Sequence, residues 1–99
     1  MKHVMVRYRV KKGKAEEVKK AIEQFVFDVK RHDWGTVSYE AFQEDELTFV
    51  HLMSFRDEKS ERLHHEADHT NRFVDMLYPN CEKEPVFTEL KPVASSRMK

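Results

Sequence analysis

The chain has 99 residues, of which 18 are basic and 18 acidic, so its formal net charge is zero. This length suits one domain, and the interspersed charges form no basic stripe of the kind that binds nucleic acid. A mean hydropathy of −0.78 and the lack of a long apolar run argue against a membrane span. Because the N-terminus also has no leader pattern, a cytoplasmic protein is expected.

The first elements in chain order are a strand and a helix. Residues 3–10 alternate between apolar and other side chains, which predicts a strand. From Ala15 to about Arg31 the apolar side chains recur at helical spacing. The segment 32–35 ends this helix, and Gly35 is expected to adopt the positive φ of a turn.

A hairpin follows the first helix. Residues 36–43 alternate again, and residues 47–55 give the strongest strand pattern in the chain. The short acidic segment 44–46 joins the two runs, which is typical of an antiparallel hairpin.

The last third of the chain predicts helix and then strand. Asp57 or Ser60 is suited to cap a helix, and Asp68 is suited to cap a second helical segment if the helix is broken there. Residues 86–90 form a last short strand, and residues 95–99 are expected to be a flexible tail.

The order of elements is βαββαβ, which predicts a ferredoxin-like α+β domain over residues 1–94, with a four-stranded antiparallel sheet. Residues 47–55 are apolar on both sides, with Val50 and Leu52 opposite Phe49 and Met53. The two helices can cover one sheet face only. We therefore expect a homodimer packed through the other face, and a small-molecule pocket between sheet and helices.

The segment 63–69 holds the densest group of titratable side chains. His65 and His69 are four residues apart and share a face if the helix is continuous. Such a pair can bind a transition metal, but the spacing fixes no third ligand, so no metal is predicted. The alternative is a set of polar side chains on a solvated helix. The single cysteine, Cys81, excludes an internal disulfide and a zinc cluster.

Other polar and aromatic side chains have two possible roles each. His51 lies within an apolar strand, where it is either a core histidine with hydrogen-bond partners or part of a pocket wall. Arg7 and Arg9 point to one face, where they can hold an anion or pair with Glu40. Five aromatic residues are candidates for a pocket or for the core: Tyr8, Trp34, Tyr39, Phe42 and Phe87.

Residues 49–58 and 63–73, together with the ending 84–93, resemble the antibiotic biosynthesis monooxygenase family. His64 and His69 keep the family's histidine spacing, and the similarity extends over roughly residues 2–94. Met53 stands where many relatives have an acidic residue, Phe55 replaces a tryptophan, and Asp68 replaces a proline. The haem-degrading branch is not favoured, because an asparagine in the first strand and a tryptophan in the helix are both missing.

The resemblance implies a dimeric α/β barrel that oxygenates a small aromatic or quinol-type compound without metal, flavin or other cofactor. It makes His64 or His69 the catalytic base and Arg9 or Tyr39 a polar anchor, while His51 and Phe73 complete the expected substrate-binding residues. The alternative is a non-catalytic dimeric barrel that binds a small molecule as a stress or regulatory module.

Overall fold

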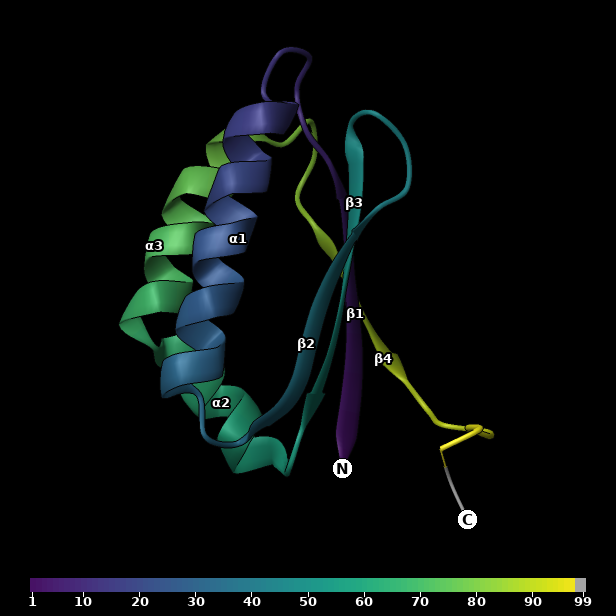
Figure 1. Ribbon diagram of the computed structural model, residues 1–99. Helices are drawn as coiled ribbons and strands as arrows, with labels where there is room; N and C mark the ends of the chain where they lie inside the picture. Colours follow the sequence, from purple (N-terminus) through teal and green to yellow (C-terminus); the bar gives the residue numbers. More distant parts are fainter. Residues whose placement is uncertain (98–99) are drawn as a thin grey trace.

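A computed structural model describes residues 1–97 and confirms the ferredoxin-like α+β fold. The four strands form one antiparallel sheet in the order β2-β3-β1-β4. Figure 1 shows the helices on one side of this sheet, whereas its other face is uncovered in the single chain. The elements are β1 (Lys2–Arg9), α1 (Ala15–His32), β2 (Thr36–Gln43), β3 (Thr48–Phe55), α2 (Glu58–Glu66), α3 (Asp68–Leu77), the short 3₁₀ helix η1 (Tyr78–Asn80) and β4 (Val86–Leu90).

The helical region after β3 is broken into α2 and α3. Asp57 caps α2, since its carboxylate accepts a hydrogen bond from the Ser60 backbone N–H at 2.8 Å. Ala67 interrupts the helix with extended backbone angles, φ −67° and ψ 146°. Ala67, and not Asp68 as expected, is the N-cap of α3, and it provides no side-chain hydrogen bond.

Gly35 is required for close packing, and the predicted positive φ is wrong. Within residues 1–97, Gly13 alone has a positive φ, of 84°. A Cβ atom on Gly35 would lie 2.1 Å from the Ser60 hydroxyl oxygen, far inside van der Waals contact. The backbone N–H of Arg56 also donates to the Gly35 carbonyl at 2.9 Å. The turn after α1 is therefore pressed directly against the start of α2.

The core lies between the helices and the inner face of the sheet. Alternate side chains of β1 and β3 point into it, in line with the period-two pattern, while α1 contributes an apolar stripe. On the outer face Arg7 forms an ion pair with Glu44 at 2.6 Å, rather than with Glu40 as considered. Among residues 1–97, the helices are all too short or too polar to cross a bilayer.

Candidate functional site

A cavity of about 230 Å³ lies between the inner sheet face and the helices. Its walls come from every layer of the fold and are mostly aromatic and apolar, which suits a small organic ligand. A larger hollow of about 440 Å³ lies on the outer sheet face around Arg7 and Arg9. Both arginines are tied there in ion pairs with acidic side chains. The inner cavity is thus the better candidate for chemistry.

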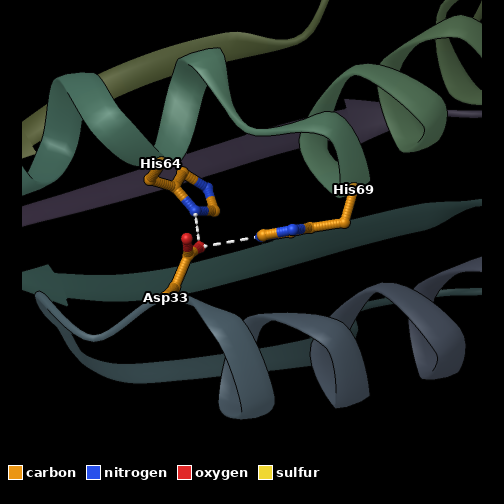
Figure 2. A group of neighbouring side chains, drawn as sticks. All are labelled: Asp33, His64 and His69. Carbon is orange, nitrogen blue, oxygen red and sulfur yellow. Dashed lines mark hydrogen bonds and ion pairs between the residues drawn. The ribbon is translucent and has the colours of Figure 1, made fainter.

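Asp33, His64 and His69 meet although they come from three different elements (Figure 2), and His64 is the member of this group that lines the cavity. Asp33 follows the last residue of α1, His64 lies in α2, and His69 lies in the first turn of α3. One carboxylate oxygen, Oδ2 of Asp33, is 2.5 Å from His64 Nδ1 and 3.1 Å from His69 Nε2. All three side chains are more than nine-tenths buried.

His64 has the geometry of a general base. A carboxylate can only accept hydrogen bonds, so His64 Nδ1 carries a hydrogen and donates it to Asp33. Burial lowers the pKa of His64, although the hydrogen bond to Asp33 acts in the opposite direction. A neutral ring with hydrogen on Nδ1 leaves the lone pair on Nε2. Because His64 lines the cavity, this lone pair is available to take a proton from a ligand.

His69 contacts the other side of this group and does not line the same cavity. Its Nε2 is within ion-pair distance of Asp33 but is not aligned for a hydrogen bond, and it has no other partner in the described chain. The Thr70 hydroxyl is also buried without a partner, and Thr70 does line the cavity. Buried polar atoms without partners are costly, typically about 1–3 kcal/mol each, and such atoms are common at functional sites.

These three residues are also the candidate metal ligands, since their donor atoms lie within 4.8 Å of one another. Two histidines and a carboxylate are a set that iron or zinc binds. Ligands about 2.1 Å from one ion lie roughly 3.0–3.4 Å apart, however. The 2.5 Å separation of His64 Nδ1 and Asp33 Oδ2 is that of a short hydrogen bond. As they stand, His64 and Asp33 form a hydrogen-bonded pair, and His69 lies within ion-pair distance of the same carboxylate oxygen.

The considered pairing of His65 with His69 does not occur. The break at Ala67 ends the continuous helix that this pairing requires. His65 is half-exposed, and its Nε2 lies 3.6 Å from Glu61, whereas His69 turns inward to Asp33.

His51 is a core histidine with hydrogen-bond partners, and it also lines the cavity, so both interpretations of it are correct. Its Nε2 is 2.7 Å from the Tyr8 hydroxyl and its Nδ1 is 2.7 Å from the Tyr39 hydroxyl. Burial lowers the pKa of His51 to about 4, and burial also raises the pKa of both tyrosines. The three groups are therefore neutral near pH 7.

The structure brings together most of the predicted site residues. His64, His51, Tyr39 and Phe73 line the cavity. Arg9 does not: its side chain is on the outer sheet face, 3.4 Å from Glu82 and 3.6 Å from Asp45.

Two residues of the segment that ends the first helix differ from expectation. Trp34 is 88% exposed and belongs to neither the cavity nor the core. Asp33 was not predicted as a site residue, because the only signal for it was its position in a helix-ending segment.

The comparisons with known proteins concern the family and the fold. The family described as "Antibiotic biosynthesis monooxygenase" matches residues 1–76. A crystal structure of an antibiotic biosynthesis monooxygenase superposes with a TM-score of 0.85 at 19% identity, covering 95% of this chain and 100% of that one. No curated protein matches the chain.

Two further structures agree with this fold. A candidate antibiotic biosynthesis monooxygenase from Nitrosomonas europaea gives a TM-score of 0.88 at 20% identity, over 95% of this chain and 100% of that one. Another, from Caulobacter crescentus, gives 0.85 at 20% identity, over 94% and 90% respectively. At these identities the likeness concerns the fold alone.

Proposed function

We infer the function of the chain from the premise that it belongs to the antibiotic biosynthesis monooxygenase family. We propose that it oxygenates a small aromatic or quinol-type compound in the inner cavity, without metal or flavin. The observation that carries this proposal is His64, which lines the cavity while its Nδ1 is held by the buried carboxylate of Asp33. Asp33 is a positioning residue that acts through His64.

The proposed reaction begins with proton removal. His64 Nε2 takes a proton from an electron-rich substrate, and Asp33 stabilises the resulting imidazolium. The substrate anion then reacts with O₂ at a ring carbon that carries hydrogen, and the resulting peroxide anion takes the proton back from the His64 imidazolium to give a hydroperoxide. Loss of water from this hydroperoxide breaks the O–O bond and leaves one oxygen atom on the carbon as a carbonyl. No external reductant is consumed.

The cavity wall suits a flat ring. Phe25 and Phe73 stack with their ring centroids 4.5 Å apart and their planes 3° apart, which gives the cavity a planar apolar surface. A volume of about 230 Å³ is at the small end of ligand sites, so one or two fused rings are the expected size. An apolar wall also excludes water from a reactive anion.

The test is oxygen uptake with a panel of quinols that have one or two fused rings. We expect the protein to accelerate uptake without added metal or flavin, and elemental analysis of untagged protein to show no stoichiometric transition metal. His64→Asn keeps an N–H that can donate to Asp33 but removes the base, so the rate should fall by about 10²- to 10⁴-fold. Lys12→Ala, a change at an exposed residue of the turn before α1 and outside the cavity, should keep the parent rate.

Either of two results would contradict the proposal: equal rates for His64→Asn and the parent, or a bound metal that is lost in that variant. His64→Ala is a poorer test, because His64 is only 3% exposed and its truncation would leave Asp33 buried without its partner. The loss of rate would then be mixed with a loss of stability.

A second candidate function is ligand binding without catalysis. It is favoured by Met53, which lines the cavity where many relatives have an acidic side chain that positions the substrate. A parent protein that binds ring compounds but never exceeds background oxygen uptake would support this function over oxygenation.

A further inference from the structure

We propose that Tyr8, His51 and Tyr39 form a hydrogen-bond donor site for a carbonyl oxygen of the ligand, and that this site works with His64 to exchange a proton on the adjacent carbon. The cavity would then catalyse the enolisation of a cyclic ketone whose exchanging C–H bond lies between an aromatic ring and the carbonyl. This inference rests on the proposed function in one respect, the role of His64 as base. Oxygen has no part in it.

Counting hydrogens shows that the Tyr8–His51–Tyr39 group has a donor to spare. The two hydroxyls and one neutral imidazole carry three polar hydrogens, but the two contacts at 2.7 Å use only two of them. In either tautomer of His51, one tyrosine accepts the ring N–H and keeps its own O–H hydrogen. That hydroxyl has no second acceptor in the described chain.

The side chains that hold the spare donor line the cavity. Tyr8, His51 and Tyr39 all line the cavity, where Tyr8 is 4% and His51 1% exposed. The Thr70 hydroxyl, 6% exposed and without a partner, is a further polar group in the same wall. An apolar cavity with unpaired hydroxyl groups fits a ligand that brings an acceptor oxygen.

The donor site and the base are neighbours. The Tyr39 ring centroid is 5.6 Å from that of His51 and 5.7 Å from that of His64. One ligand can therefore place its carbonyl oxygen at the donor site and the adjacent C–H bond at His64. Burial keeps both groups in a medium of low polarity, where hydrogen bonds to a developing negative charge are strong.

The proposed step is balanced without oxidant or reductant. His64 Nε2 removes a proton from the carbon, the C–H electron pair forms the new C=C bond, and the carbonyl π electrons move to the oxygen. The enolate oxygen is stabilised by the spare hydroxyl. In D₂O the hydrogen that His64 has taken exchanges with solvent deuterium before it is returned. Return of a deuteron from His64 to the carbon restores the ketone, which then carries deuterium at that carbon.

The experiment uses 2-tetralone, a bicyclic ketone whose C1–H bonds lie between the ring and the carbonyl, in D₂O under argon. We expect the NMR signal of the C1 hydrogens to disappear faster with the protein than in buffer. His64→Asn should remove this acceleration. The double variant Tyr8→Phe with Tyr39→Phe should slow exchange by about 10²- to 10³-fold. Phe27→Leu removes an aromatic ring that is half-exposed on α1 and does not line the cavity, so this variant should keep the parent rate.

Binding provides a readout that needs no variant to fold. Tetralin has the same two rings without the oxygen, and a net hydrogen bond should make 2-tetralone bind to the parent protein roughly 2- to 10-fold more tightly. Equal affinities, or exchange no faster than in buffer, would overturn the inference. Exchange without oxygen uptake would support the proposed enolisation and contradict the proposed oxygenation. Oxygen uptake without exchange would contradict the enolisation and leave the oxygenation standing.

Discussion

At the scale of single residues, the site depends on one carboxylate oxygen that lies close to two histidines. Asp33 Oδ2 fixes the hydrogen of His64 on Nδ1 and so determines which nitrogen faces the ligand. Without this contact, either tautomer of His64 would be available, and only one of them has a lone pair on Nε2.

Buried histidines make the free energy of unfolding depend on pH. The pKa of His51 is about 4 in the folded protein and about 6.5 when unfolded, so the unfolded state binds more protons between these values. The contribution of His51 is complete above about pH 6.5 and is lost as the pH falls toward 4. The pKa of His64 is also lowered, so its effect has the same sign.

Urea unfolding at pH 7 and pH 5 measures this effect. For His51 alone we expect the free energy of unfolding to be lower at pH 5 by about 2 kcal/mol, since one pKa unit corresponds to about 1.4 kcal/mol. His51→Gln should be less stable at pH 7 and should show a shallower pH dependence than the parent. Identical slopes for the two proteins would contradict the low pKa.

Sequence reasoning proposed His64 and His69 as site residues, but it did not single out Asp33, the acidic residue that lies close to both. His64 and His69 share a short segment and a family spacing, whereas Asp33 is 31 residues before His64. Only the packing of the end of α1 against α2 and α3 brings it there, and no local pattern encodes that packing. Arg9 was misplaced for a similar reason, since alternation does not say which face of a strand meets the helices.

At the scale of elements, the break at Ala67 makes the site possible. Five residues of continuous helix correspond to a rotation of about 500°, so His64 and His69 would point roughly 140° apart. The extended backbone of Ala67 turns α3 relative to α2 and lets both rings reach Asp33 (Figure 2).

The turn at Gly35 fixes the position of the end of α1 against the start of α2. In Gly35→Ala, the new methyl group would overlap Ser60 of α2, so we expect a loss of about 1–3 kcal/mol in the free energy of unfolding. The rate of oxygen uptake should fall as well, because Asp33 is two residues from this contact. Adding Ser60→Gly should restore part of both, and a double variant no better than Gly35→Ala would contradict this explanation.

The elements themselves were largely predictable, because their patterns are local. β2 and β4 begin and end where alternation predicts, and Asp57 caps α2 as one of the two expected candidates. The role of Gly35 was not predictable, since a glycine needed for close approach and a glycine needed for a left-handed turn look the same in a sequence.

At the scale of the whole molecule, the outer face of the sheet carries apolar side chains that the helices of the same chain do not cover. Phe42 is 49% exposed there and is paired with Val50 of β3, while Val86 of the edge strand β4 is 63% exposed and is paired with Arg7 of β1. Apolar patches of this kind usually mark an interface, and we expect two copies to pack through it.

Light scattering at micromolar concentration should return twice the chain mass of 11.9 kDa. Leu52→Glu places a charge in the centre of this face and should give the single-chain mass. Lys20→Glu, an exposed charge reversal on α1, should leave the mass of the parent unchanged. A parent protein of 11.9 kDa would remove the prediction of a homodimer.

The origin of Asp33, His64 and His69 in three separate elements also has a consequence for when the candidate site is assembled during folding. An intermediate in which β1, β2 and β3 have paired but α2 and α3 have not yet docked contains three of the four strands and lacks the candidate site. Joining residues so far apart in the chain is slow compared with forming a hairpin or a helix. Under the proposed function, the recovery of oxygen uptake after dilution from denaturant therefore times the docking of α2 and α3, an event that the recovery of secondary structure does not report.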